Sequence, residues 1–251
     1  MHSLSRRSLA FASAILLLTA AQASVTEVIK RSYPLTPDGV VSLSNISGSV
    51  EITAWDKNEV SLEAEKIASS DDALGLLSIN IDMTPNSLVI KTEQKRKWKF
   101  WNLFNNSKVN YRLRVPAGVS LAKIAVVNSN ITVRGVRGRV DLDTVNGRIV
   151  ATGLSSDGRF DTVNGSIDVS FDSLKNVRRV GLDTINGSCQ LRLPADAGAH
   201  VSADTVNGRI TCDFPIRLES SGRHSLRGSI GDGATEIVLD SVNGSLRIDS
   251  K

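Results

Sequence analysis

The sequence has few aromatic residues, few cysteines and little net charge. Aromatic residues make up 4% of its 251 residues, so a folded core must be aliphatic. Two cysteines exclude a disulfide-rich scaffold and a multi-cysteine zinc module. Six prolines and nineteen glycines exclude collagen-like and low-complexity classes. A formal net charge of +4 is too small for a globally basic nucleic-acid binder. The length suits one large domain or two small ones.

The first 23 residues are typical of a secretory signal peptide. Arg6 and Arg7 precede an apolar run from Leu9 to Thr19 and a small-x-small cleavage signal, Ala21-Gln22-Ala23. The apolar run is roughly a dozen residues, short of the ~20 that a bilayer-spanning helix needs. The general secretory route and the twin-arginine route both stay open.

Cleavage after this leader predicts a mature chain that begins at Ser24. Loss of the two leader arginines lowers the net charge from +4 to about +2. The mature chain has no other long apolar run, so we expect it to lack a transmembrane helix. We expect it in the periplasm or on the cell surface.

One octet occurs five times in the second half of the chain. Its eight positions are, in order, an apolar residue, Asp, a residue that is either Thr or Ser, an aliphatic residue, Asn, Gly, a residue that is either Arg or Ser, and a second apolar residue. The copies are Leu142–Ile149, Phe160–Ile167, Leu182–Cys189, Ala203–Ile210 and Leu239–Leu246. Shorter copies, Ser44–Val50 and Val127–Ile131, extend the series. Such self-similarity is typical of repeat architectures.

Residues around each Asn-Gly pair alternate between apolar and polar, as in strands with one buried face. Each repeat therefore holds two short strands and two turns. Identical residues that recur about every 20 positions favour a parallel solenoid, in which each coil covers the edge of its neighbour. An antiparallel meander is the alternative. A left-handed hexapeptide helix does not fit, because the six-residue aliphatic spacing that it needs is missing from the sequence. In a parallel stack the asparagines would form a structural ladder of amide hydrogen bonds; they are Asn146, Asn164, Asn186, Asn207 and Asn243.

The N-terminal region, Ser24 to about Pro116, is less regular. Short alternating segments separated by Pro, Gly, Asn and Asp predict six strands. They contain Val41 and Leu43, Val50 and Ile52, Val60 and Leu62, Ile79 and Ile81, Leu88 and Ile90, and Tyr111 to Val115. Ser69 to Leu77 could form one short helix with Ser70 or Asp71 as its N-cap. No linker separates this region from the repeats, so we expect one continuous all-β body.

Several segments together resemble the bacterial putative-adhesin family of β-strand-repeat envelope proteins, also called toastrack-like and otherwise described as a domain of unknown function. The segments are Ser47–Asp56, Val115–Val119, the Asn-Gly octets, Thr211–Pro215 and Gly228–Gly233. The resemblance covers nearly all of the mature chain. It implies a β-helix-like or stacked-strand domain in the envelope, and it brings no catalytic motif.

The five octet aspartates could form a column of carboxylates that binds Ca²⁺. One Asp per coil gives too few convergent oxygens, so we expect each Asp to cap its turn by accepting backbone N–H bonds. The acids and arginines occupy repeat positions instead of forming one separate cluster, which favours a scaffold over a catalytic site. His200 and His224 stand in turn-like contexts with no nucleophile beside them. We therefore predict no metal site and no catalytic residue.

Cys189 and Cys212 both fall at inward positions, on coils expected to be neighbours. If these coils align, two strand positions and one inter-strand step of ~4.8 Å separate them. The resulting Cα distance of about 8 Å exceeds the usual ~7 Å limit for a disulfide. Free thiols are favoured, and a register shift would allow a bridge.

One segment departs from the repeats by combining four cations with four aromatic residues. They are Lys95, Arg96, Lys97, Trp98, Lys99, Phe100, Trp101 and Phe104. These side chains could contact a lipid surface, a glycan or a protein. Alternatively, the aromatics could cap an open end of the solenoid. A nucleic-acid partner does not fit the export signal.

The sequence thus predicts an all-β protein with a parallel β-solenoid of two-strand repeats over residues 117–251. This solenoid continues from a β region over residues 24–116 that carries the basic aromatic insertion 95–108. We expect an exported, non-enzymatic envelope protein without a cofactor, presenting a rigid repeat surface for adhesion or binding. Two alternatives stay open: a polysaccharide-acting enzyme on a β-helix scaffold, and an envelope-stress or assembly accessory protein that contacts membrane through residues 95–104.

Overall fold

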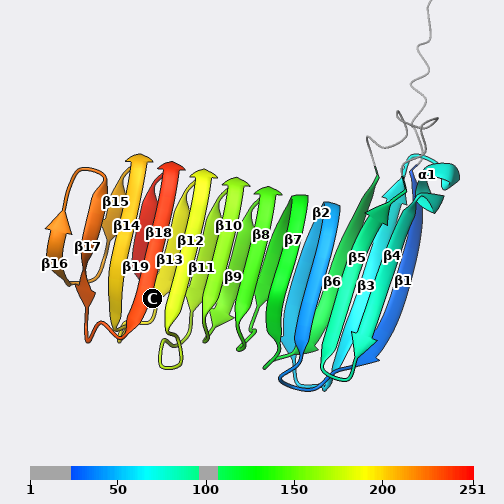
Figure 1. Ribbon diagram of the computed structural model, residues 1–251, viewed down its shortest axis with the longest axis horizontal. Coiled ribbons are helices and arrows are strands. Elements are labelled where there is room, and N and C mark those ends of the chain that lie inside the picture. The colour runs from blue at the N-terminus through cyan, green and yellow to red at the C-terminus, as the bar shows by residue number, and fades with distance from the viewer. Residues whose placement is uncertain (1–23, 96–106) are drawn as a thin grey trace, which may run out of the picture.

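The computed structural model describes residues 24–95 and 107–251 (Figure 1). These residues form nineteen strands and one short helix. The first elements along the chain are β1 (Val25–Pro34), β2 (Val40–Trp55), β3 (Glu59–Ala68), α1 (Asp71–Gly75), β4 (Leu77–Thr84), β5 (Ser87–Gln94), β6 (Lys108–Pro116) and β7 (Ser120–Arg134). The basic aromatic segment lies outside the described residues except for Lys95. The chain is all-β, as the alternating pattern predicts.

The remaining strands carry the octets and one hairpin. They are β8 (Val140–Asn146), β9 (Ile149–Leu154), β10 (Gly158–Asn164), β11 (Ile167–Phe171), β12 (Arg179–Asn186), β13 (Cys189–Leu193), β14 (Ala199–Asn207), β15 (Ile210–Cys212), β16 (Ile216–Ser221), β17 (Ser225–Ile230), β18 (Thr235–Asn243) and β19 (Leu246–Ser250). Each octet ends one strand at its asparagine and starts the next strand at its last residue.

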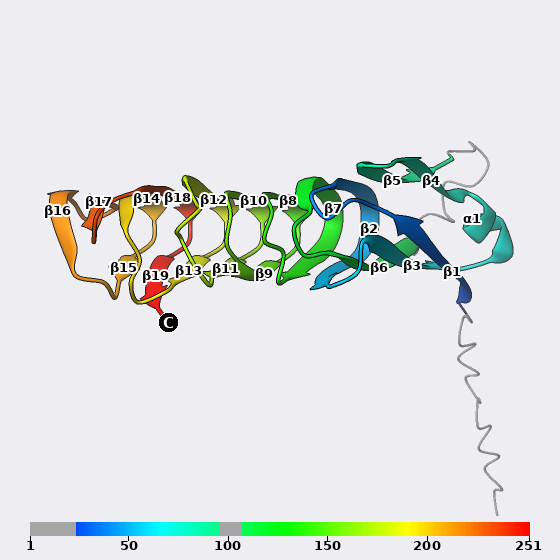
Figure 2. The ribbon, with the colours of Figure 1, turned by 90° about the horizontal axis from the view of Figure 1, so that it is seen from below.

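The strands lie in two facing rows, which Figure 2 shows from below. The row drawn above, the upper row, runs β4, β5, β2, β7, β8, β10, β12, β18, β14, β17 and β16. The lower row runs β1, β3, β6, β2, β7, β9, β11, β13, β19 and β15. The long strands β2 and β7 contribute to both rows.

The octet strands pair in parallel and in register, residue for residue. Asp161 on β10 pairs with Asp143 on one side and with Asp183 on the other, and Asn164 pairs with Asn146 and Asn186. An antiparallel meander is therefore excluded for the octets. The short copies in β2 and β7 continue the same pattern, since Gly48 pairs with Ser129 in parallel.

The spatial order of the octets differs from their order in the chain. The last octet, on β18 and β19, lies between β12/β13 and β14/β15. The hairpin of β16 and β17 explains this place, because β17 pairs antiparallel with the outer edge of β14. Only the other edge of β14 is then open to the returning chain. The sequence-based expectation that chain neighbours are also coil neighbours is wrong at this point.

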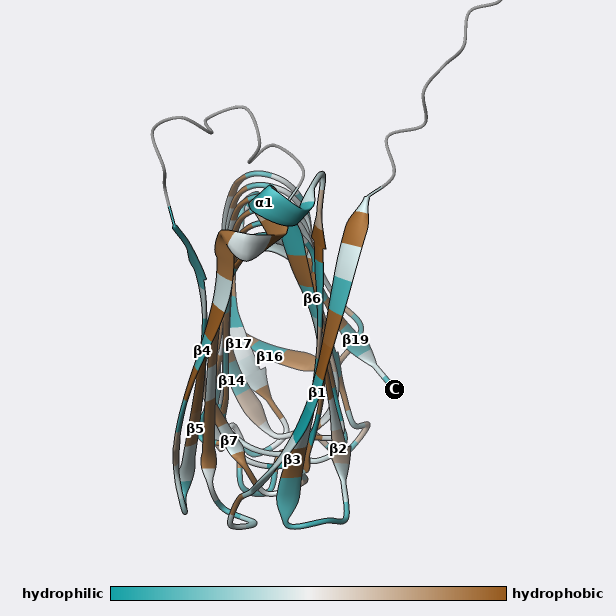
Figure 3. Ribbon diagram, turned by 90° about the vertical axis from the view of Figure 1, so that its right-hand side faces the viewer, coloured by the Kyte–Doolittle hydropathy of each residue, from teal (hydrophilic) through white to brown (hydrophobic). Residues whose placement is uncertain are grey.

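The core lies between the rows and is mainly aliphatic. Nearly all first and last residues of the octets are part of it; Leu142, Ile149, Leu182 and Leu246, for example, are at most 1% exposed. Truncation of one such side chain to Ala costs about 2–5 kcal/mol. Figure 3 shows brown, hydrophobic residues alternating with teal ones along the strands.

The N-terminal strands and helix agree with the sequence pattern. The six predicted strand segments fall in β2, β3, β4, β5 and β6, with β2 carrying two of them. Helix α1 begins after Ser70, whose Oγ accepts a hydrogen bond from the backbone N–H of Ala73 at 3.2 Å. The pattern did not reveal β1, β16 or β17. The first two of these are largely exposed, so they lack a strong inward apolar set.

Candidate binding surfaces

The asparagines of the octets lie along one edge of the stack and bond to one another. Each side-chain amide donates to the side-chain oxygen of the next asparagine at 2.8–2.9 Å. The order is Asn207, Asn243, Asn186, Asn164, Asn146 and Asn128. All bonds run in one direction, so each polarises the next. The ladder joins six coils at the surface.

The buried hydroxyls of the octets satisfy the turn carbonyls. Thr144 donates to the carbonyl of Ser129 at 3.1 Å, and Thr184 donates to that of Gly165 at 3.2 Å. Thr162, Thr205 and Ser241 make the equivalent bonds to Gly147, Gly244 and Gly187. The turns also require glycine. A Cβ on Gly165 would lie 1.9 Å from the carbonyl oxygen of Gly147 in the next coil.

The octet aspartates do not cap the turns, so that prediction is wrong. They lie in strands and point outward, and within residues 24–95 and 107–251 none of the five accepts a bond from a backbone N–H. Asp161 pairs with Arg159 at 2.7 Å, and Asp204 pairs with Arg227 at 3.2 Å. The hydroxyl of the following residue already serves the turn, which leaves the carboxylate free to face outward.

The aspartates form an acidic column on the outer face of the upper row. Its order across the strands is Asp143, Asp161, Asp183, Asp240 and Asp204. Burial raises the pKa of Asp161 and Asp240, and the charges of neighbouring aspartates raise both further. In the described part of the chain, no group of three or more His, Cys, Asp or Glu side chains could hold a metal ion.

An aliphatic ridge runs beside the acidic column. It consists of the outward residues that precede the asparagines, and these are 36–61% exposed. Its members are Val127, Val145, Val163, Ile185, Val242 and Val206, with Ile46 at the N-terminal end. No role was assigned to this position from the sequence. The β-branched residue at this outward site in every copy was nevertheless a visible signal of an exposed aliphatic surface.

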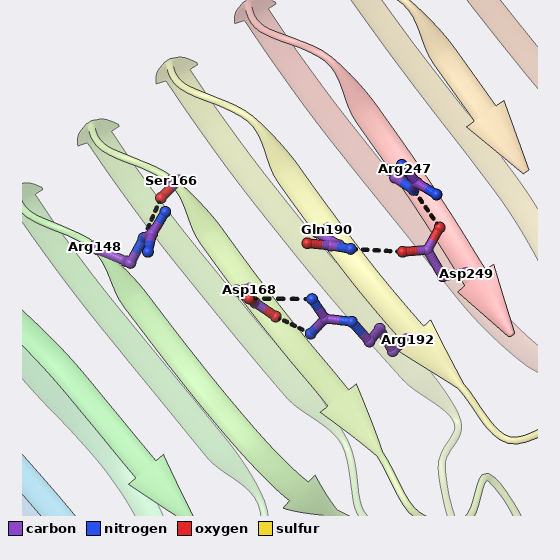
Figure 4. Close-up of polar contacts among 7 residues, drawn as sticks. All are labelled: Arg148, Ser166, Asp168, Gln190, Arg192, Arg247 and Asp249. Carbon is purple, nitrogen blue, oxygen red and sulfur yellow. Dashed lines mark hydrogen bonds and ion pairs between the residues drawn. The ribbon is translucent and has the colours of Figure 1, made fainter. Parts of the chain in front are cut away.

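The outer face of the lower row carries a polar network (Figure 4). Arg148 donates to Ser166 at 2.7 Å, and Arg192 contacts both carboxylate oxygens of Asp168. These contacts link strands across the row, so adjacent coils are joined by side chains outside as well as by the backbone.

Asp249 is the buried centre of this network. It accepts from Gln190 at 2.6 Å and from Arg247 at 2.5 Å. Burial alone would raise the pKa of Asp249, but the hydrogen bonds from Arg247 and Gln190 outweigh it and lower the pKa below its usual value. This carboxylate is therefore charged and fully used within the protein.

His200 is not isolated, contrary to the sequence prediction. Its Nδ1 lies 3.4 Å from Ser229 Oγ and 3.5 Å from Glu219 Oε1. A serine–histidine–acid triad needs the serine and the acid on opposite ring nitrogens. Both groups here approach the same nitrogen at long distances, so the three side chains form a surface contact between β14, β16 and β17.

The two cysteines are free and do not lie on neighbouring coils. Cys189 pairs with Leu246 on one side of β19, and Cys212 pairs with Ile248 on the other side. The inserted last octet therefore separates them by two inter-strand steps. Burial raises the pKa of Cys189 to about 12 and also raises that of the half-buried Cys212.

Of the predicted basic aromatic site, only Lys95 lies within the described residues. It is exposed, and its backbone N–H donates to the carbonyl of Leu76 at 2.9 Å. A cation–aromatic group that the sequence did not reveal surrounds Trp55, with Lys57 5.1 Å and Arg114 5.9 Å from the ring centre. Lys57 is two residues from Trp55 in the chain, whereas Arg114 is brought to the ring only by the fold.

No helix in the described ranges has both the length and the apolar character needed to cross a bilayer. No family model and no curated protein matches the chain. The chain is similar to the solved structure of a putative cell adhesion protein from Clostridium sporogenes, at 12% identity and a TM-score of 0.42, over 91% of this chain and 100% of that one. It is also similar to a putative adhesin from Bacteroides fragilis, at 11% identity and a TM-score of 0.41, over 88% and 97% of the two chains.

A third similar structure is a putative lipid binding protein from Parabacteroides distasonis, at 10% identity and a TM-score of 0.30. The match covers 89% of this chain and 96% of that one.

Proposed function

We propose that this chain is an exported, non-enzymatic envelope protein whose β-solenoid presents a rigid, repeating surface for adhesion or binding. One observation carries the proposal: the octets align in parallel register, so that their outward aspartates and their outward valines or isoleucines recur from coil to coil. Coils repeat about every 4.8 Å. An extended or repetitive partner could contact several coils in the same way.

The rigidity of the surface is supported by three sets of hydrogen bonds. The backbone pairs adjacent coils, the asparagine ladder ties their edge, and the buried hydroxyls tie the turns. A surface that is ordered before binding loses little conformational entropy when a partner docks. The aliphatic ridge and the acidic column are the outward features available for contact on the upper row.

The alternative of a polysaccharide-acting enzyme has less support. Most carboxylates on the outer faces belong to the repeat or to ion pairs such as Asp168 with Arg192. The contacts of His200 do not have the order of a catalytic triad. Incubation of the mature chain with envelope polysaccharides should release no new reducing ends or unsaturated products, and either product would favour the enzyme.

The accessory role through residues 95–104 stays a prediction of the sequence. The two strands that flank this segment in the chain, β5 and β6, reach the same edge of the molecule as α1 (Figure 1). Arg96→Ala with Lys97→Ala should weaken binding of the mature chain to anionic vesicles if this segment contacts membrane. Lys175→Ala, in the loop before β12, is the control.

Photo-crosslinking in cells tests the proposed function. A photoreactive residue is placed at Val163 on the aliphatic ridge, at Val150 on the outer face of the lower row, and at Lys175 as a loop control. We expect adducts with an envelope protein or glycan from at least one of the two faces, and none from Lys175. Adducts within the chain alone at all three positions would contradict a binding role for either face.

A further inference from the structure

A hollow of about 400 Å³ lies on the outer face of the upper row. It covers the adjacent strands β10, β12 and β18, whose places in the row Figure 1 shows. We call it the Gly181 hollow, because Gly181 on β12 lies in its wall between Arg159 on β10 and Val238 on β18. Every other octet coil has a side chain at this register. The volume is within the range of small-ligand sites.

The glycine is not explained by the fold. Its φ is not positive, and a Cβ added to it would meet nothing within 4 Å. By contrast, the turn glycines such as Gly165 are required by a carbonyl of the next coil. A glycine inside a strand lowers stability through its backbone entropy and often marks a place where a ligand approaches closely.

The hollow has a positive end and a negative end. At the positive end lie Arg139 and Arg179. The guanidinium of Arg179 contacts Glu236 at 3.5 Å. The carboxylate there, Asp157, is already used: it accepts from the backbone N–H groups of Arg178 at 2.7 Å and Arg179 at 3.3 Å. Arg139 has no ion-pair partner among the described residues, and Arg179 has guanidinium donors beyond its one contact with Glu236, so this end can hold a further anion.

The negative end consists of Asp161, Asp183 and Asp240. Asp161 is neutralised by Arg159. Asp183 and Asp240 are in-register neighbours, and neither has an ion-pair partner among the described residues. Two adjacent unpaired carboxylates attract a cation, and an ammonium group between them could donate to both. The hollow thus has the charge arrangement of a dipolar ligand.

The ligand must carry its two charges well apart. Arg179 and Asp183 are four residues apart on β12, about 13 Å along a strand. A free amino acid holds its ammonium and carboxylate on one carbon and cannot reach both ends. An extended tripeptide spans about 10 Å, and the long arginine side chains reach the rest. Arginine binds carboxylates through two parallel hydrogen bonds.

We propose that the Gly181 hollow binds a short zwitterionic peptide, with its ammonium group against Asp183 and Asp240 and its carboxylate against the guanidinium of Arg179. The proposal deepens the proposed function, on which it rests, by naming a ligand class for one part of the repeat surface. The site differs from the repeating surface because it occurs once, at the coil that has no side chain at this position.

Titration of the isotope-labelled mature chain with triglycine, followed by NMR, tests the proposal. We expect saturable shifts of the amide signals of Gly181, Leu182 and Val238. N-acetyl-triglycine lacks the ammonium group, triglycine amide lacks the carboxylate, and each should bind at least tenfold more weakly. Binding of either blocked peptide as tight as that of triglycine would overturn the proposal. So would binding of galacturonate without binding of triglycine, since that would assign the hollow to acidic sugars.

Three variants test whether the peptide binds in the Gly181 hollow. Gly181→Leu fills the hollow without a backbone clash, and it should weaken triglycine binding at least tenfold while the remaining spectrum stays unchanged. Asp183→Asn with Asp240→Asn should have the same effect. Asp143→Asn, in the same acidic column but outside the hollow, should change binding less than twofold. Unaltered binding to the Gly181→Leu protein would overturn the proposal even if the aspartate variants are poorly folded.

The crosslinking experiment separates this proposal from the proposed function. If Gly181→Leu still forms the envelope adducts but triglycine does not bind the unaltered chain, the hollow has been misassigned and the repeating surface stands. If triglycine binds and the envelope adducts are absent, the hollow stands and the adhesion role fails.

Discussion

The side-chain amide of Asn243 donates to the side-chain oxygen of Asn186 at 2.8 Å, although 57 residues separate them. Asn207, which is nearer to Asn186 in the chain, is bonded to Asn243 instead. The last octet therefore completes the middle of the stack. The chain leaves this place open when it passes from β13 to β14 and fills it only with its C-terminal residues.

The ladder predicts unequal costs for two identical substitutions. Asn243→Ala removes one bond that Asn243 donates and one that it accepts, whereas Asn207→Ala removes only the donated bond. At about 0.5–1.5 kcal/mol for each net hydrogen bond, Asn243→Ala should lower the free energy of unfolding about twice as much. Urea denaturation of both variants measures this. Equal losses of the free energy of unfolding would show that stability does not depend on the number of ladder bonds removed.

Replacing one buried octet hydroxyl by a methyl group should lower the stability of the fold more than the same exchange at an exposed threonine. Thr184→Val keeps the shape of the side chain but leaves the carbonyl of Gly165 without its donor. An unpaired buried polar group costs about 1–3 kcal/mol. The exposed Thr211→Val is the matched control and should change stability by less than about 0.5 kcal/mol. Thermal unfolding of the two variants decides the point.

The pKa of Asp240 is raised in the folded protein and that of Asp249 is lowered. Neutralising these two side chains should therefore have opposite effects on stability. The folded pKa of Asp240 is raised by burial and by Asp183 and Asp204, so its charge destabilises the fold once the pH rises above that pKa. Asp240→Asn should stabilise the protein at pH 7 by a few tenths of a kcal/mol, since solvent screens this half-exposed site. The gain should fade as the pH falls through the raised pKa, where the wild-type carboxyl is protonated.

The folded pKa of Asp249 is lowered, so its charge contributes stability above the ordinary pKa, and that stability is lost as the pH falls through the folded value. Asp249→Asn should destabilise the protein at pH 7 by about 1–3 kcal/mol, because Arg247 and Gln190 lose a charged acceptor. Urea denaturation from pH 3 to pH 7 measures both variants. Changes of the same sign at pH 7 would contradict this assignment.

The cysteines should differ in reactivity. The thiolate is the reactive form, and burial raises the pKa of Cys189 to about 12, so almost none is ionised at pH 8. Cys212 is half-buried and also has a raised pKa. In the folded protein at pH 8 we expect slow labelling of Cys212 by a thiol reagent and none of Cys189. Mass spectrometry locates the label, and rapid labelling of both in urea confirms that both are free.

The leader predicts a defined N-terminus. Mass spectrometry of the protein recovered from the envelope fraction should give a chain that starts at Ser24. Ala23→Leu should block cleavage, because the signal requires a small residue there, and it should retain the precursor. Full-length protein in the cytosol of wild-type cells would contradict export.

Much of the local structure could be read from the sequence. Alternation around each Asn-Gly predicts two short strands, and the six apolar pairs before Pro116 predict strands that the fold contains. The segment from Ser69 predicts the start of α1 at Ser70 or Asp71, and the helix begins after Ser70. These features depend on near neighbours in the chain, because side-chain alternation and turn chemistry are local.

The candidate sites could be read less well. The aspartates were expected to cap turns, but the adjacent hydroxyls of Thr144 and its counterparts take that role. His200 meets Ser229 and Glu219 only because β14, β17 and β16 pair in that order. The Gly181 hollow depends on what the two adjacent coils carry at the same register, which no single segment reveals.

The sequence by itself determined that the chain forms short alternating strands, that Asn-Gly marks the turns, and that equivalent octets can stack in register. The tertiary structure decided the order of the coils. The reason is physical: nearly identical octets present nearly identical edges, so pairing between any two has nearly the same local free energy. The β16–β17 hairpin breaks this equivalence by covering one edge of β14, and the last octet is left with the inner place beside β12.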